Sequence, residues 1–218
     1  MSFRVAMFAG ALSLTLLSIG SCRHTTVDQE SRLFRAASDG DEPEAASLIA
    51  GGVNVNAREP EGETPLMYAA AAGQTRMVVF LLKKGADINA PSTNGETALV
   101  RAGGETETVQ VLLDHGADVE LGNPLIHASY AGYLDTVRLL LRKGANPNAR
   151  LVDGDTALIA AVVQGTPRSR DIIGELIAAG AHAESKNKQG KTAEMLAIEN
   201  RRDDLAELLR RAGAADSR

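Results

Sequence analysis

The chain has 218 residues, and from residue 31 onward its sequence repeats with a period of about 33. An apolar pair followed by glycine recurs six times, with spacings of 33, 31, 28, 36 and 33 residues, at Gly52, Gly85, Gly116, Gly144, Gly180 and Gly213. A second column is spaced by 33, 33, 26 and 33 residues, at Leu33, Leu66, Leu99, Leu125 and Leu158. Because two independent columns share one period, the sequence predicts a stack of repeated units rather than a domain with one central core.

Each unit favours two short helices separated by a turn. A side-chain oxygen that can cap the first helix is present at Thr64, Thr97, Asn123, Thr156 and Thr192. The second helix carries apolar residues at the three-and-four spacing of one buried face, as at Val78, Leu81 and Leu82. The glycine that follows suits the left-handed turn that ends many helices.

The most regular unit, residues 62–90, reads GETPLMYAAAAGQTRMVVFLLKKGADINA and closely resembles the ankyrin repeat. The resemblance covers residues 31–215 and implies an all-α ankyrin-repeat solenoid of about six helix-turn-helix repeats with short β-turn fingers. The repeats are expected at 31–57, 58–90, 91–120, 121–149, 150–184 and 185–215, followed by a tail at 216–218. A stack of thin helices agrees with the 35 alanines and only seven aromatic residues of the chain.

Three departures from the repeat pattern are expected to shape the surface. The connection from Asp118 to Pro124 is five residues shorter than its equivalent one repeat earlier, so no long finger can form there. The third repeat loses two residues around Gly103-Gly104, which predicts a shortened first helix because glycine is a poor helix former. The fifth repeat gains three residues between Gly165 and Arg170, which predicts a projecting loop.

The histidine of the family's Thr-Pro-Leu-His motif is missing. Its column is apolar and holds Phe34, Met67, Val100, Ile126, Ile159 and Met195, so apolar packing is expected to replace polar bracing between repeats. His127 falls one place later, where we expect a partly buried structural residue. The end repeats carry polar runs, at 39–44 and at 201–211, which we expect to cover the two outer faces of the stack.

Residues 1–21 have the pattern of an export signal, with a positive start at Arg4 and an uncharged apolar run over residues 5–19. The residues before Cys22, Ile-Gly-Ser, resemble a bacterial lipobox, which implies that Cys22 is lipidated and begins the mature chain. Two alternatives stay open: ordinary signal cleavage that leaves Cys22 as a free thiol, and an uncleaved membrane anchor.

Residues 22–30 are polar and are expected to form a tether between the lipid and the repeats. Arg23 follows the cysteine, where the inner-membrane retention signal has Asp, so the resemblance implies an outer-membrane lipoprotein that faces the periplasm. The alternative location is a soluble periplasmic or secreted form released by signal cleavage.

Charge and motif content argue against several classes of protein. The formal net charge is −5 and no basic stripe occurs, so nucleic acid is not an expected partner. One cysteine and four scattered histidines do not form a zinc-binding pattern. The sequence lacks a Gly-rich phosphate loop, a Gly-x-Ser-x-Gly elbow and a His-Glu-x-x-His motif, and Asp153-Gly154-Asp155 fits a finger turn better than a calcium loop. We therefore expect neither catalysis nor a metal or cofactor.

The function class that remains is recognition of a protein partner. In ankyrin proteins the partner contacts the fingers and first helices, which implies a binding surface at Arg58, Glu59, Glu61, Ser92, Thr93, Asn94, Tyr130, Tyr133, Leu151, Val152 and Asp153. Two tyrosines three residues apart suit an interface because tyrosine is a common anchor. The alternative is that both rings fill space left by the short connection at 118–124.

We therefore expect a monomeric, non-enzymatic binding module with an unidentified protein partner. Resemblance to exported bacterial ankyrin proteins leaves two finer roles open: an immunity protein that neutralises an antibacterial toxin, and a protective accessory to a periplasmic stress enzyme such as catalase. A further alternative, of the structural class, is an envelope scaffold that is not dedicated to one partner.

Overall fold

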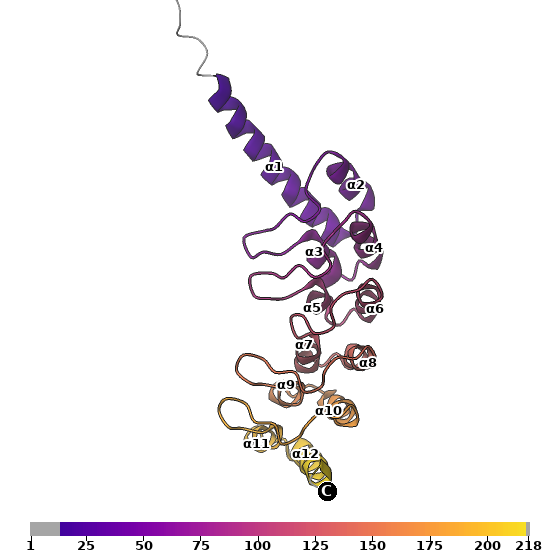
Figure 1. The fold of residues 1–218 in the computed structure, drawn as a ribbon, viewed down its shortest axis with the longest axis vertical. Coiled ribbons are helices and arrows are strands. Elements are labelled where there is room, and N and C mark those ends of the chain that lie inside the picture. Colours follow the sequence, from indigo (N-terminus) through magenta and orange to yellow (C-terminus); the bar gives the residue numbers. More distant parts are fainter. Residues whose placement is uncertain (1–13, 217–218) are drawn as a thin grey trace, which may run out of the picture.

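A computed structural model describes residues 14–216, with side chains from Val27 to Gly213. Within these residues the chain forms helices α1 to α12 and no strand. Figure 1 shows the helices as two parallel rows that run the length of the molecule, with loops projecting from the inner row. The predicted all-α repeat solenoid is confirmed.

The helices alternate between the two rows. The inner row holds α1 (Leu14–Asp39), α3 (Pro65–Ala71), α5 (Ala98–Ala102), α7 (Pro124–Ala131), α9 (Ala157–Gln164) and α11 (Ala193–Glu199). The outer row holds α2 (Glu42–Ala50), α4 (Thr75–Lys83), α6 (Thr106–Asp114), α8 (Leu134–Arg142), α10 (Ser169–Ala178) and α12 (Asp203–Asp216). At five residues α5 is shorter than its neighbours α3 and α7, which have seven and eight, as the Gly103-Gly104 sequence predicts.

Threonine side chains cap four of the inner helices as predicted. Their Oγ1 atoms accept a hydrogen bond from the N–H three residues on, over 3.2 to 3.5 Å, at Thr64, Thr97, Thr156 and Thr192. The prediction that Asn123 caps α7 is wrong, because its backbone is left-handed (φ 56°) and its side chain makes no cap hydrogen bond. The short connection enters α7 through this conformation, which asparagine tolerates better than most residues.

One continuous apolar cluster runs through the repeats. Ala69, Ala70 and Ala128 are at most 3% exposed and allow neighbouring inner helices to approach closely. On the outer helices Val78 and Leu81 are fully buried, as are their equivalents in later repeats. Burial is thus spread along the stack, so each repeat depends on its neighbours for most of its core.

Asparagine side chains brace successive repeats, which the sequence pattern did not predict. The Oδ1 atoms of Asn56, Asn89 and Asn148 accept hydrogen bonds of 2.8 to 2.9 Å from backbone N–H groups about 30 residues further on. The column that lacks the family histidine is packed by apolar side chains as expected, with Met67 and Ile159 buried. The stack therefore combines apolar packing with polar bracing supplied by other residues.

The C-terminal face of the stack is more apolar than predicted. Arg210 pairs there with Glu194 at 3.0 Å and with Glu207 at 2.8 Å. However, Met195 is 47% exposed and Ile198 is 51% exposed, because no element among the described residues covers this side of α11. The charged residues of the last repeat cover only part of its outer face.

Residues 22–30, expected as a tether, lie within α1, which continues into the first repeat at Leu33. No helix among residues 14–216 combines the length and the apolar character needed to span a membrane. Residues 1–13 and 217–218 and the side chain of Cys22 lie outside the described part of the chain, so the export signal and its lipidation stay predictions.

Candidate partner-binding face

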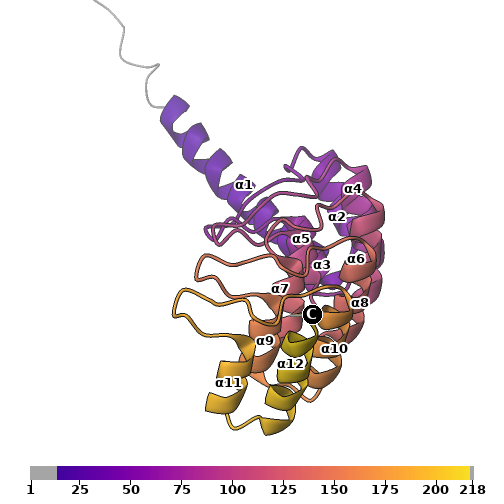
Figure 2. The ribbon, with the colours of Figure 1, turned by 60° about the horizontal axis from the view of Figure 1, so that its bottom comes forward.

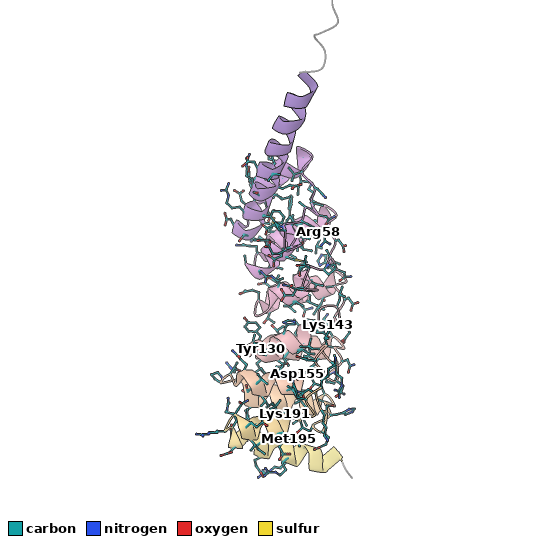
Figure 3. All side chains as sticks on the ribbon, turned by 90° about the vertical axis from the view of Figure 1, so that its left-hand side faces the viewer. Arg58, Tyr130, Lys143, Asp155, Lys191 and Met195 are labelled. Carbon is teal, nitrogen blue, oxygen red and sulfur yellow. The ribbon has the colours of Figure 1, made fainter. Side chains whose placement is uncertain are left out.

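Four of the five connections between repeats form tight fingers, at residues 59–63, 92–96, 151–155 and 187–191. In each finger the first residue donates its N–H to the carbonyl of the last, over 2.8 to 3.1 Å. We call the surface made by these fingers and by the exposed sides of the inner helices the finger face. Figure 2 shows the fingers projecting from the inner row away from the outer row, and Figure 3 looks onto this face.

The fingers are joined in two pairs. In the first pair Thr93 donates its N–H to the carbonyl of Glu61 at 2.9 Å, and in the second Lys188 donates its N–H to the carbonyl of Asp153 at 2.9 Å. The glycine next to each contact has no side chain to block it, since a Cβ on Gly62 would lie 3.0 Å from the Thr93 nitrogen. The two pairs are therefore built in the same way at opposite ends of the stack.

An arginine holds each finger pair from the same position of its repeat. Nη1 of Arg58 donates to the carbonyl of Gly62 at 3.1 Å and to that of Pro91 at 2.7 Å. Nη1 of Arg150 donates to the carbonyls of Gly154 and Lys186 at 3.3 and 2.7 Å. Arg58 was predicted to contact a partner, whereas the structure gives its guanidinium a role within the finger pair.

The short connection over residues 118–123 interrupts the row of fingers (Figure 1). It lies flat against the preceding finger, where a Cβ on Gly122 would come within 2.9 Å of the Gly95 carbonyl oxygen and of Val100. The carbonyl of Leu121 accepts a hydrogen bond from Thr97 at 3.5 Å. A gap between the two finger pairs results, and the inner helices α5 and α7 lie beneath it.

The predicted finger residues differ in exposure. Those exposed to solvent are Arg58, Glu61, Thr93, Asn94, Val152 and Asp153, with Val152 at 89%, and those partly buried are Glu59 and Ser92. The prediction that Leu151 is exposed at a fingertip is wrong, because its side chain is partly buried and packs against the core. Leu151 is the first residue of its finger, and only the residues after it reach the tip.

Tyr133 fills space over glycines rather than the space left by the short connection. An ideal Cβ on Gly104 would lie 3.0 Å from two carbons of the Tyr133 ring, and one on Gly103 would lie 3.1 Å from a third. Gln74 and Glu105 lie in the same way over Gly40 and Gly73 of their preceding repeats. Tyr133 therefore belongs to a regular contact between repeats, although its side chain stays 43% exposed.

A hollow of about 220 Å³ lies between α5 and α7, below the gap in the fingers. Tyr130, which is 48% exposed, and Tyr133 line it together with His127, Glu96 and Arg101. The prediction that His127 is partly buried is wrong, since its side chain is exposed. The structure thus brings both predicted tyrosines to one site and adds three residues that the sequence did not predict to bind a partner.

Ion pairs connect the hollow to the first finger pair. The Arg101 guanidinium lies 3.2 Å from a Glu63 carboxylate oxygen and 3.5 Å from one of Glu96. Nearby, the Tyr68 hydroxyl donates to Glu59 at 2.7 Å, and this hydrogen bond, together with burial of the phenol and the Glu59 and Glu63 charges, raises the pKa of Tyr68 to about 12. Two carboxylates therefore share one guanidinium at the edge of the hollow.

Among the residues that the structure describes, no group of three or more His, Cys, Asp or Glu side chains is arranged to hold a metal ion. The signal that points to the hollow is the loss of residues in two consecutive repeats, in α5 and in the connection that follows it. Both losses remove protein atoms from the space between α5 and α7.

Comparison with known proteins agrees with this architecture. The family model described as "Ankyrin repeats (3 copies)" matches residues 33–123, 91–150 and 125–217. Among curated proteins, the chain is 48% identical over 58 residues to human ankyrin repeat and KH domain-containing protein 1, covering 26% of this chain and 2% of that protein. It is 35% identical over 108 residues to the mouse B-cell lymphoma 3 protein homolog, covering 47% of this chain and 23% of that protein. The chain therefore spans less than a quarter of the length of these relatives.

Solved structures match over a larger part of the chain. An ankyrin repeat domain from Acinetobacter baumannii AYE superimposes with a TM-score of 0.72 at 29% identity, covering 83% of this chain and 97% of that one. A chain from the Bd0816 predatory endopeptidase of Bdellovibrio bacteriovorus in complex with immunity protein Bd3460 superimposes with a TM-score of 0.71 at 32% identity, covering 83% and 97%. Ankyrin repeats indicate a protein–protein interaction module, and this chain belongs to the ankyrin repeat family.

Proposed function

We propose that the chain binds one protein partner on its finger face and is held by a lipid on Cys22 at the periplasmic side of the outer membrane. The observation that carries the binding role is the gap between two hydrogen-bonded finger pairs, with two half-exposed tyrosines beneath it. Aromatic residues at the centre of a face, surrounded by polar ones, are typical of interface anchors. The exposed apolar side chains of Val152 and Val163 extend this face beyond the tyrosines.

Capture with the full chain tests the binding role. The chain, expressed with its own leader and a C-terminal tag in its native host cells, should enrich one envelope protein from detergent extracts. The Tyr130→Ala variant should lose this protein, because the ring is half exposed and contributes to the finger face. Arg142→Ala, an exposed change on the outer row, serves as the matched control and should retain it. Equal capture by Tyr130→Ala would contradict the use of this face.

The lipid anchor has a separate test. Replacing Cys22 with alanine should move the protein from the membrane fraction to the soluble periplasmic fraction and should abolish incorporation of labelled palmitate. Thr26→Ser keeps the cysteine and the lipobox-like segment and should leave both properties unchanged. Retention of the Cys22→Ala protein in the outer membrane fraction would rule out lipid anchoring without affecting the proposed binding role.

A finer candidate is an immunity protein, and the likeness to a chain of the endopeptidase–immunity protein complex favours it. In this role the chain would inhibit an exported enzyme that otherwise damages the cell's own envelope. Cells that lack the chain should then lyse when the gene of a neighbouring exported hydrolase is induced, and the wild-type chain should restore growth. If no such hydrolase kills these cells, the immunity role fails while partner binding can still be tested by capture.

A further inference from the structure

The hollow between α5 and α7 exists because two adjacent deletions remove the groups that would otherwise fill it. Helix α5 ends at Ala102 and is followed by Gly103 and Gly104, which carry no side chains. The short connection at 118–123 places no finger in front of the opening. Buried Leu99, Val100 and Ala128 contribute the inner wall, so the hollow has an apolar base and an open mouth on the finger face.

The size of the hollow favours a side chain of a protein over a free small molecule. Its volume of about 220 Å³ lies below the roughly 300–1,000 Å³ of ordinary ligand pockets. A protein that docks on the finger face can insert one large side chain there, while its surrounding surface contacts the finger pairs. One anchor residue would then contribute most of the binding free energy, which is common in protein interfaces.

The tyrosine rings at the mouth favour a cationic group. Tyr130 and Tyr133 are about half exposed, and neither hydroxyl has a hydrogen-bond partner among the described side chains and backbone groups. The face of an aromatic ring attracts a guanidinium or ammonium group, and arginine makes such contacts more often than lysine. An arginine also brings an aliphatic stem that can lie against the apolar base.

The charges around the mouth of the hollow also favour a cationic group. Arg101 is the one arginine or lysine lining the hollow, and it is already paired with both Glu63 and Glu96. Two carboxylates against one guanidinium leave one negative charge, and the first finger adds Glu59 and Glu61 against the single cation Arg58, so the local charge stays negative. An acidic side chain would meet like charge at this opening, whereas a basic one would gain a partner.

We propose that the hollow receives a single arginine side chain of the protein partner, which packs against Tyr130 and Tyr133 and pairs with the Glu96 carboxylate. The inference rests on the proposed function, because it names the chemistry by which the finger face selects its partner. The partner should therefore present a basic side chain that projects from the surface that docks here. Because the guanidinium is planar and carries five donors, lysine should be a weaker substitute.

The three tyrosines of the chain, Tyr68, Tyr130 and Tyr133, allow a direct test. The full chain in detergent micelles, labelled with ¹³C on tyrosine rings, is titrated with acetyl-Gly-Arg-Gly-amide while ring signals are recorded by NMR. The signals of Tyr130 and Tyr133 should shift with saturation, and that of Tyr68 should stay in place as an internal control. The corresponding lysine peptide should bind at least threefold more weakly, and the glutamate peptide should cause no shift.

Two variants separate the site from general surface charge. Glu96→Gln should weaken binding of the arginine peptide at least fivefold, whereas Glu61→Gln, the same change of charge on an exposed finger, should alter it less than twofold. Tyr130→Leu retains an apolar side chain on the half-exposed position and should abolish the shift of Tyr133. Equal shifts with the arginine and glutamate peptides, or equal effects of the two glutamine variants, would overturn the proposal.

The same experiments distinguish failure of this inference from failure of the proposed function. If the full chain captures a partner through the finger face but the arginine peptide leaves Tyr130 and Tyr133 unchanged, the arginine anchor is wrong and the binding role stands. If the peptide binds as expected but no envelope protein is captured, the proposed function fails.

Discussion

The ring of Tyr133 lies against the backbone of Gly104, so closely that a Cβ atom at Gly104 would approach two ring carbons to 3.0 Å. Gly104 does not have a positive φ, so the requirement for glycine there arises from the ring and not from backbone conformation. This contact explains why a poor helix former occurs in the third repeat. Loss of the side chains there both shortens α5 and creates the seat for the ring.

We therefore predict that Gly104→Ala lowers the free energy of unfolding by about 1–3 kcal/mol, the usual cost of overpacking. The penalty should largely disappear in a Tyr133→Ala background, because the clash is with that ring. Urea unfolding followed by circular dichroism measures both effects.

A matched control for Gly104→Ala is Gly174→Ala in α10. A Cβ at Gly174 would meet no atom within 4 Å, and the residue lies inside a helix. This change should raise stability by about 0.5–1 kcal/mol, since alanine replaces glycine in a helix interior. If Gly104→Ala is stabilising to the same extent, the close contact with Tyr133 is not real.

The periodic features of the fold were predictable from the sequence because they depend on local rules. The threonine caps and the left-handed glycines after the outer helices, such as Gly85 at φ 90°, follow from backbone chemistry within a few residues. Asn123 could not be predicted in this way, because the shortened connection before α7 decides its conformation. Local capping rules fail where the chain length between two fixed helices changes.

The candidate site was only partly predictable. Tyr130 and Tyr133 could be found because aromatic residues are rare in the chain, with seven in 218 residues. Glu96, Arg101 and His127 are ordinary surface residue types, and only the arrangement of two shortened elements brings them around one hollow. For Arg58, the position in the sequence predicted a fingertip side chain free to contact a partner. In the structure its guanidinium instead donates hydrogen bonds to two carbonyl groups.

The finger pairs should respond independently to loss of their arginines. Arg58→Ala removes hydrogen bonds to the carbonyls of Gly62 and Pro91, so the amide of Thr93 should exchange with solvent about five times faster, equivalent to roughly 1 kcal/mol. The amide of Lys188, in the other pair, should be unaffected because the short connection at 118–123 separates the two pairs. Hydrogen exchange followed by NMR gives both rates.

Arg150→Ala provides the reciprocal control. It removes the bond to the carbonyl of Lys186 and should accelerate exchange at Lys188 while leaving Thr93 unchanged. If either variant accelerates exchange in both finger pairs, the fingers form one cooperative unit and the gap does not separate them.

The hydrogen bond from Tyr68 to Glu59 should make stability depend on pH in the alkaline range. The folded pKa is about 12 against the usual 10.0, so the folded chain holds the phenol proton more tightly than the unfolded chain. The resulting stabilisation is complete below pH 10 and is lost as pH rises toward 12. Glu59→Gln should lower the pKa of Tyr68 toward 10, measured as tyrosinate absorbance, and Tyr68→Phe should remove the transition near 12. A transition for Tyr68 near 10 in the wild-type chain would contradict this account.

Two methionines at the same place in different repeats give the sharpest test of the stack as a one-dimensional array. Met67 is 1% exposed because the next repeat covers it, whereas Met195 is 47% exposed at the end of the row. Met67→Ala should lower the free energy of unfolding by about 2–5 kcal/mol, the cost of a cavity in a packed core. Met195→Ala should change it by less than about 0.5 kcal/mol, as expected for an exposed side chain. Urea unfolding of both variants measures the difference, and a large loss at Met195 would mean that a further element or a second molecule covers α11 in solution.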